Sequence, residues 1–233
     1  DTPDLRNTRV IHIIAELTDS LNNMDLPEIK GDSIIQIGTT FHIYGERSCS
    51  YKHIVTLDQT DPIPGVDVES CATEEELLFK WRDMINRTNP EIMTGYNIFG
   101  FDFVYIHDRA VDLGIAGSFM QIGRFKEVSC QFKENKLSSS ALGDNVLKFI
   151  DMHGRVLIDM MKVIQRDHKL DMYSLNNVAH HFMGMKKNDV SPQDIFRLQQ
   201  GNSHDRKIVA EYCVQDCELC NNLMIKLEII ANN

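Results

Sequence analysis

The 233-residue sequence lacks a surplus of positive charge, a long apolar run and a dense set of cysteines. It has 24 Lys and Arg residues against 34 Asp and Glu residues, and this net charge of −10 excludes a basic nucleic-acid-binding tail or a polycationic membrane binder. No apolar run approaches the roughly 18 to 20 residues that a membrane-spanning helix requires. The first residues show no basic and then apolar signal pattern. We therefore expect a soluble intracellular protein with no membrane partner.

The six cysteines are too few for a disulfide framework in a chain of this length. Reduced thiols are expected. One cluster, Cys213-x3-Cys217-x2-Cys220, invites a zinc-site interpretation. The three thiols lie on one continuous helical stretch with no fourth ligand at finger-like spacing, so helix packing is the favoured interpretation.

The composition, with 42% hydrophobic and 25% charged residues, is that of a globular protein and excludes disordered and fibrous classes. The length suits one large or two small domains. Helical and strand patterns alternate along the chain, which is typical of an α/β fold. Helices are predicted over 8–24, 74–87, 103–113, the stretch after Ser191-Pro192 and from Ser203 to about Ile230; strands are predicted over 34–44, 51–57, 92–94 and in two stretches on either side of a polar loop at 137–145.

A carboxylate interrupts the apolar stripe of the last predicted helix. Asp216 lies between Tyr212 and Leu219 on this stripe. An ionised Asp at a buried position is costly unless a cation or strong hydrogen bonds compensate it, which indicates either a metal ion or a Lys or Arg partner. Tyr212 precedes Asp216 by one helical turn on the same face, so its hydroxyl can reach whatever the carboxylate holds.

A second carboxylate, Asp102, follows the strand at 92–94 through the turn Tyr96-Asn97-Ile98-Phe99-Gly100-Phe101. A carboxylate between a strand end and a helix start suits a metal ligand in an α/β protein. The same position also suits a helix N-cap. Asp159, after Val156-Leu157-Ile158, is predicted to be a helix cap.

Taken together, Asn97-x3-Phe101-Asp102 and Tyr212-x3-Asp216 resemble the second and third exonuclease motifs of family B DNA polymerases. Three further stretches resemble the same domain in the same order: residues 34–38, 154–159 and 166–179. The polar loop 138–145 is similar to that of the delta-like polymerases of large double-stranded DNA viruses. The resemblance covers nearly all of residues 31–233.

This resemblance implies a ribonuclease-H-like fold, with a mixed sheet flanked by helices, that carries 3′→5′ proofreading activity. Four carboxylates in this family hold two divalent ions, Mg²⁺ or Mn²⁺, roughly 4 Å apart. The resemblance assigns Asp102 and Asp216 as two of these ligands and Tyr212 as the residue that orients the attacking water. It places Asn97 and Phe101 along the groove for the frayed 3′ end.

The family context also implies the partners. They are the single-stranded 3′ end of a DNA primer, the palm, fingers and thumb of one longer polymerase chain, and a sliding clamp. The implied location is the nucleus or the cytoplasmic replication site of an infected cell.

The first motif of the family, a strand reading Asp-x-Glu ahead of the Ile-Gln-Ile strand, is not found before Ile35-Gln36-Ile37. Ile14-Ala15-Glu16 keeps only the glutamate, and its helical setting suits a surface residue better than a ligand. We expect residues 1–30 to be a helical insertion, residues 31–233 to be the exonuclease domain, and the chain to be a polymerase fragment. Such a fragment would bind metal weakly and cleave poorly.

Two other functions remain open from the sequence. A degenerate exonuclease-like module that only binds DNA or acts as a scaffold would have the same fold without the metals. His107-Asp108 and His204-Asp205 instead suit helical metal phosphohydrolases, which use a His-Asp pair. That class expects an all-helical chain, and the predicted hairpin at 34–57 argues against it.

Overall fold

The computed structural model describes residues 31–46, 48–139, 143–185 and 190–232. The chain divides into two compact units, residues 1–32 and 33–233, and the second unit is the one described below. The predicted helix at 8–24, the proposed insertion 1–30 and Glu16 lie outside the described residues.

The first sheet of the unit has the strand order β1 (Gln36–Phe41), β2 (Tyr51–Leu57) and β3 (Asp67–Cys71). β1 and β2 are antiparallel and β2 and β3 are parallel. The predicted hairpin at 34–57 is therefore confirmed, and the all-helical phosphohydrolase interpretation is wrong. β3 was not predicted from the sequence.

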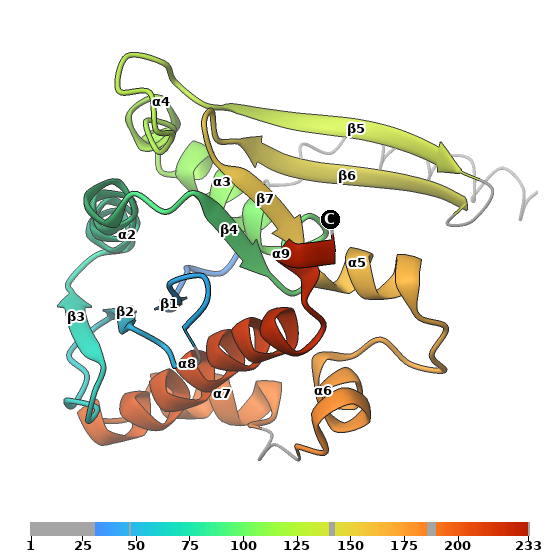
Figure 1. Cartoon of the computed structure of the whole chain (residues 1–233). Coiled ribbons are helices and arrows are strands. Elements are labelled where there is room, and N and C mark those ends of the chain that lie inside the picture. The colour runs from blue at the N-terminus through green and yellow to red at the C-terminus, as the bar shows by residue number, and fades with distance from the viewer. Residues whose placement is uncertain (1–30, 47, 140–142, 186–189, 233) are drawn as a thin grey trace, which may run out of the picture. The chain divides into compact units, whose positions relative to one another are not determined.

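Two helices cover opposite faces of this sheet (Figure 1). α2 (Glu74–Thr88) begins at Thr73, whose side chain accepts a hydrogen bond from the backbone N–H of Glu76, as the sequence predicted. α2 packs on one face, where Val55 joins the largest core cluster. α8 (Ser203–Lys226) packs on the other face, where Ile54 contacts Ala210 and Val214. Strand periodicity explains the arrangement, because successive side chains of β2 point to opposite faces.

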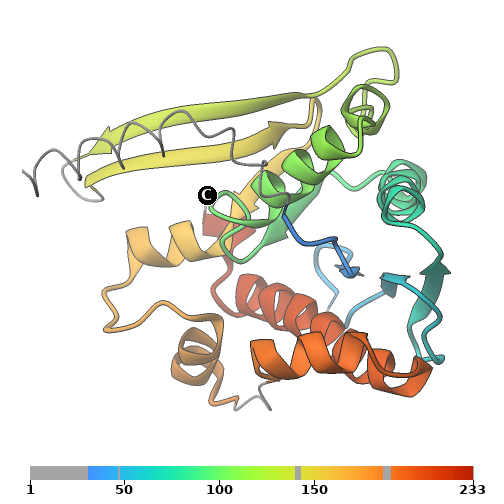
Figure 2. The same ribbon diagram turned by 180° about the vertical axis from the view of Figure 1, so that it is seen from behind.

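The second sheet pairs β4 (Ile92–Gly95) with β7 (Val156–Asp159) in parallel register. A turn leads from β4 into α3 (Asp102–Asp112), and the short α4 (Ala116–Phe119) follows. The third sheet is a long antiparallel hairpin of β5 (Gln131–Ser139) and β6 (Gly143–Asp151), which is seen at full length in Figures 1 and 2. The predicted loop at 137–145 is therefore too long, because both strands continue into it.

Helices make up the C-terminal part of the unit: α5 (Met160–Asp167), α6 (Leu175–Met183), α7 (Pro192–Gln199), α8 and α9 (Ile229–Asn232). Ser191 caps α7 and Pro192 occupies its first turn, as predicted. α7 lies alongside α8 (Figure 2). The predicted last helix is wrong at its end. It stops at Lys226, and Glu228, with a φ of 50°, separates it from α9.

A buried ion pair joins α2 to α3 beside the largest core cluster. The Arg109 guanidinium donates to both carboxylate oxygens of Glu74, at 2.8 Å and 2.6 Å, and the backbone N–H of Ile34 donates to Glu74 at 2.8 Å. Both charged residues are 7% exposed. This network ties the segment before β1 to two helices. Across the described residues, no helix is both long enough and apolar enough to cross a membrane.

Candidate functional site

The turn after β4 has a backbone shape that depends on two residues. Asn97 has a φ of 63°, a left-handed conformation that Asn tolerates better than most residues. Its carbonyl accepts hydrogen bonds from the N–H groups of Gly100 and Phe101, at 3.0 Å and 2.9 Å. A Cβ on Gly100 would lie 2.3 Å from Asn97 Oδ1, so a larger residue there would displace the Asn97 side chain. The turn therefore leads directly into the first residue of α3, Asp102.

A buried carboxylate on the neighbouring strand holds this turn. Asp159, which is 2% exposed, accepts from the backbone N–H of Asn97 at Oδ1 and of Phe99 at Oδ2, both at 3.0 Å. It also accepts from the N–H of Met161 at 3.0 Å and so caps α5, which confirms the predicted cap. The sequence analysis missed the link to the turn. The signal that could have revealed it is the parallel pairing that sets Gly95 opposite Asp159.

Asp102 lies in the first turn of α3, and the predicted alternative that it caps this helix is wrong. The N-cap residue is Phe101, and it makes no side-chain cap hydrogen bond. Asp102 is exposed as a whole residue, but surrounding protein atoms partly remove its carboxylate from water. This desolvation and the negative charge of Asp159 both disfavour the ionised carboxylate. Together these causes raise the pKa of Asp102 to about 6. Phe101 is 59% exposed and stacks on Tyr105 with the ring centroids 5.6 Å apart.

Tyr212 and Asp216 occupy adjacent turns of α8, and both are half-buried. Between them, α8 comes very close to β1 at Gly38. A Cβ on Gly38 would lie 2.9 Å from Cys213 Sγ and 3.2 Å from Cys217 Sγ. One turn further along, Asn221 donates to Thr40 Oγ1 at 2.7 Å.

The two thiols at this contact are free and form a hydrogen-bonded pair, which confirms the helix-packing interpretation of the cysteines. The hydrogen bond from Cys217 lowers the pKa of Cys213. The charges of Asp216 and Asp102 act on Cys213 in the opposite direction. Both carboxylates are therefore near enough for their charges to act on one thiol, although they come from segments that are far apart in the sequence. The packing of α8 on both β1 and β4 explains how α8 and the turn meet.

Comparison with known proteins gives this arrangement a family. Residues 8–178 match the family model of the exonuclease domain of DNA polymerase family B. The chain belongs to this family. The match includes the turn residues Asn97, Phe101 and Asp102 and ends before Tyr212 and Asp216.

Similar proteins support the same conclusion. The chain is 44% identical to the DNA polymerase of Pyramimonas orientalis virus, over 91% of the chain and 22% of that polymerase. It is 40% identical to the DNA polymerase delta catalytic subunit of Glycine max and 37% identical to that of Drosophila melanogaster, in each case over 88% of the chain and 19% of the relative. The chain thus spans about a fifth of the length of these curated relatives.

The donor chemistry of the site fits the divalent metals that exonuclease domains of this family use. Asp102 and Asp216 supply carboxylate oxygens, which are the ligands that Mg²⁺ and Mn²⁺ prefer. Desolvation and the charge of Asp159 both disfavour the ionised form of Asp102 and raise its pKa, and a bound cation would oppose both effects.

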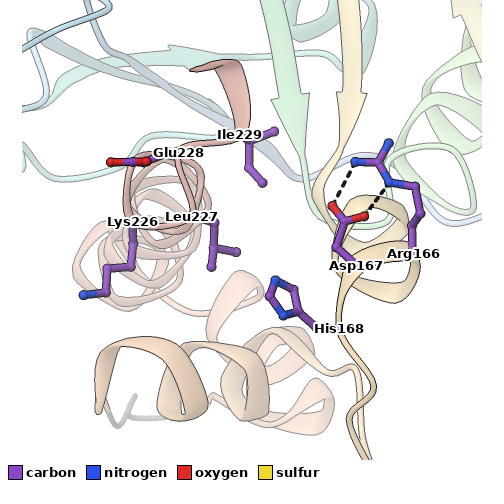
Figure 3. Close-up of a pocket in the computed structure, with 7 residues that line it drawn as sticks. All are labelled: Arg166, Asp167, His168, Lys226, Leu227, Glu228 and Ile229. Atoms are coloured by element: carbon purple, nitrogen blue, oxygen red, sulfur yellow. Dashed lines mark hydrogen bonds and ion pairs between the residues drawn. The ribbon is translucent and has the colours of Figure 1, made fainter. Parts of the chain in front are cut away.

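A cavity of about 500 Å³ lies elsewhere in this exonuclease-family domain, between the end of α5 and the junction of α8 with α9 (Figure 3). Its lining includes both basic and acidic side chains, and Arg166 pairs with Asp167 through two hydrogen bonds, at 2.7 Å and 2.8 Å. The cavity is lined by Arg166, Asp167, His168, Lys226, Leu227, Glu228 and Ile229. None of the site residues predicted from the sequence borders it.

Proposed function

We propose that this exonuclease domain hydrolyses the 3′-terminal phosphodiester of DNA and serves as the proofreading domain of a longer polymerase. The observation that carries the proposal is the packing of α8, which bears Tyr212 and Asp216, on β1 and β4, so that the charges of Asp216 and Asp102 both act on Cys213. Metal-assisted phosphodiester cleavage requires carboxylates from different segments that are brought near one another.

Each residue has a proposed part in this reaction. Asp102 and Asp216 hold divalent cations of the Mg²⁺ or Mn²⁺ class, which supply an activated water and stabilise the leaving 3′ oxygen when bound. Tyr212 orients the attacking water through its hydroxyl. Asn97 and the exposed Phe101 line the groove for the unpaired 3′ end, where an aromatic face can stack on a base.

The fold that we propose is ribonuclease-H-like, with β1 and β4 as parts of one interrupted sheet. Two observations support this. α8 packs against both strands, and among the described residues β1 and β4 each have a hydrogen-bonded strand neighbour on one edge only. A strand inserted between these edges would complete a single mixed sheet.

The proposed partners follow from the family. They are the single-stranded 3′ end of a primer, the palm, fingers and thumb of the same polymerase chain, and a sliding clamp. We propose that the domain acts in the nucleus or at the cytoplasmic replication site of an infected cell.

The test is digestion of a 3′-labelled single-stranded oligonucleotide with Mn²⁺, comparing the chain with Asp216→Ala. Glu211→Ala, which removes an exposed carboxylate of the same helix, is the matched control. We expect cleavage to fall at least about 100-fold in Asp216→Ala and to stay unchanged in Glu211→Ala. Folded chain that binds the oligonucleotide without cleaving it would fit both the degenerate binding module and the poor cleavage expected of a chain without the first motif. Equal cleavage by all three proteins would overturn the assignment of Asp216.

A further inference from the structure

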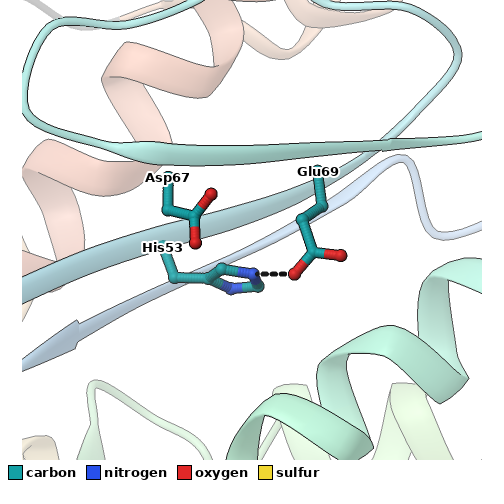
Figure 4. A group of neighbouring side chains, drawn as sticks. All are labelled: His53, Asp67 and Glu69. Atoms are coloured by element: carbon teal, nitrogen blue, oxygen red, sulfur yellow. Dashed lines mark hydrogen bonds and ion pairs between the residues drawn. The ribbon is translucent and has the colours of Figure 1, made fainter.

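A second group of metal-donor side chains lies on the first sheet, and we name it the β2–β3 cluster: His53, Asp67 and Glu69 (Figure 4). The parallel register sets His53 beside Asp67, and Glu69 follows two residues later on the same face of β3. One donor atom from each residue lies within 4.8 Å of the other two. His53 Nε2 is 2.9 Å from Glu69 Oε1. The strand pairing therefore brings the three donors together without any contribution from a loop.

The β2–β3 cluster is separate from the proposed exonuclease site. Thr39, opposite His53 in the register, accepts a hydrogen bond from the Trp81 indole, so this face of the sheet is turned towards α2. Gly38, one residue earlier, faces Cys213 of α8. Asp67-Val68-Glu69 does have the Asp-x-Glu spacing of the first exonuclease motif, but it follows the Ile-Gln-Ile strand. It also lies on β3, which β2 separates from β1.

The buried position of the imidazole and the solvent access of the carboxylates favour an ion at the cluster. The His53 side chain is fully buried, and no partner within the described part of the chain hydrogen-bonds to its Nδ1. Asp67 is exposed and the Glu69 side chain is 28% exposed, so the carboxylates open the cluster to solvent above a buried imidazole. Nε2, the nitrogen that faces Glu69, is the one that would ligate the ion, and because the fold already holds this ring in place, little further ordering would oppose binding.

The neighbouring charges come from β2 and α2. The Tyr51 hydroxyl donates to Asp67 Oδ2 at 2.7 Å and also interacts with Arg87. Lys80 Nζ lies 3.5 Å from Glu69 Oε2 and equally 3.5 Å from Glu76 Oε1. Lys80 can therefore retain its ion pair with Glu76 when Glu69 binds an ion instead of Lys80. Tyr51 is placed to orient Asp67, as residues behind metal ligands do.

We propose that the β2–β3 cluster binds a divalent transition ion of the zinc class. Imidazole nitrogen and carboxylate oxygen are both ligands that Zn²⁺ accepts, with bonds of roughly 2.0 to 2.2 Å, and three protein ligands leave a fourth position for water. The imidazole argues against Mg²⁺ and Ca²⁺, which select oxygen ligands. The ion would join β2 to β3, and its binding would stabilise the folded domain in proportion to its affinity.

The test is calorimetric titration of the chain with Zn²⁺, together with the visible absorption spectrum of the Co²⁺-loaded chain, which reports coordination. Asp67→Asn changes an exposed ligand and should lower the affinity at least about 100-fold, more than the loss of a residue that only orients a ligand. Tyr51→Phe should lower it about tenfold. Lys80→Gln should raise the affinity, because it removes a competing cation.

Two controls separate this site from the others. Asp102→Asn with Asp216→Asn removes any Zn²⁺ bound at the proposed exonuclease site and should leave the affinity of the β2–β3 cluster unchanged, so failure of the exonuclease proposal would not affect this one. Cys213→Ser with Cys217→Ser excludes thiol binding in the same way. His53→Gln should abolish binding, and its thermal unfolding shows whether the variant is folded. If the unmodified chain does not bind Zn²⁺, or if Asp67→Asn binds it equally well, the proposal is overturned.

Discussion

The two faces of the β1–β2–β3 sheet are built in opposite ways. On the α8 face, a glycine and two thiols let the helix come close to the strand, with small residues such as Ala210 and Val214 around them. On the α2 face, polar groups are buried in pairs: Thr39 with Trp81, and His53 with Glu69. The comparison teaches that close packing at Gly38 helps to position α8, which carries Asp216, whereas polar pairs add to the apolar packing of α2 on the other face.

The largest expected effect is at the ion pair of α2. Arg109→Ala leaves Glu74 buried without its cation, and we expect the free energy of unfolding to fall by about 3 to 5 kcal/mol. Urea denaturation measures it. The exposed pair of Arg197 with Asp194 is the control, and Arg197→Ala should cost about 0 to 1 kcal/mol. Equal losses of unfolding free energy in the two variants would show that the buried ion pair does not stabilise the packing of α2.

The same ion pair predicts a dependence on pH. Burial opposes the charged form of Glu74, but hydrogen bonds from Arg109 and Ile34, with the charge of Arg109, outweigh it and lower the pKa of Glu74. Because the folded pKa is depressed, this stability is fully present above the unfolded pKa of about 4.3 and is lost as the pH falls through the folded value. Arg109→Ala should therefore flatten the acid limb of a stability profile, which urea midpoints from about pH 2 to 6 would show.

A smaller effect is expected on the α8 face. Gly38→Ala places a methyl group against Cys213 and Cys217, and overpacking of this kind costs about 1 to 3 kcal/mol. Cys213→Ala in the same chain removes the nearer sulfur and should restore part of the loss, which a double-mutant cycle measures. Gly117→Ala, where nothing lies within 4 Å of the new methyl group, should cost almost nothing. Strictly additive losses of stability in the double mutant would contradict the view that close packing at Gly38 positions α8.

The sequence predicted the elements that carry strong local signals. The cap at Thr73, Ser191 before Pro192, and the turn 96–102 all have side chains whose local chemistry fixes the backbone. Asn97, Phe101 and Asp102 were placed correctly on one turn because they are neighbours in the chain. The roles assigned to them remain predictions.

Other features depend on contacts between remote segments and were missed. β3 has one apolar residue between two carboxylates, and only its pairing with β2 makes it a strand. The hydrogen bonds from the turn to Asp159 arise from strand pairing, and the close contact of Cys213 with Gly38 arises from helix packing. No local sequence pattern encodes either of them. The β2–β3 cluster was missed for the same reason, since His53 and Asp67 meet only through the register.

The smallest effect separates the two faces with neighbouring residues of one strand. Thr39→Val and Thr40→Val are nearly isosteric changes at adjacent positions of β1. Thr39→Val removes the acceptor of the half-buried Trp81 indole hydrogen bond, 3.1 Å long, and should cost about 1 to 2 kcal/mol. Thr40→Val should cost less, about 0.5 kcal/mol, because Asn221 keeps its second acceptor, the backbone carbonyl of Thr40 at 3.2 Å. Urea denaturation midpoints show which of the two variants loses more stability. A larger loss in Thr40→Val would mean that hydrogen bonding, rather than close packing at Gly38, positions the helix that carries Asp216.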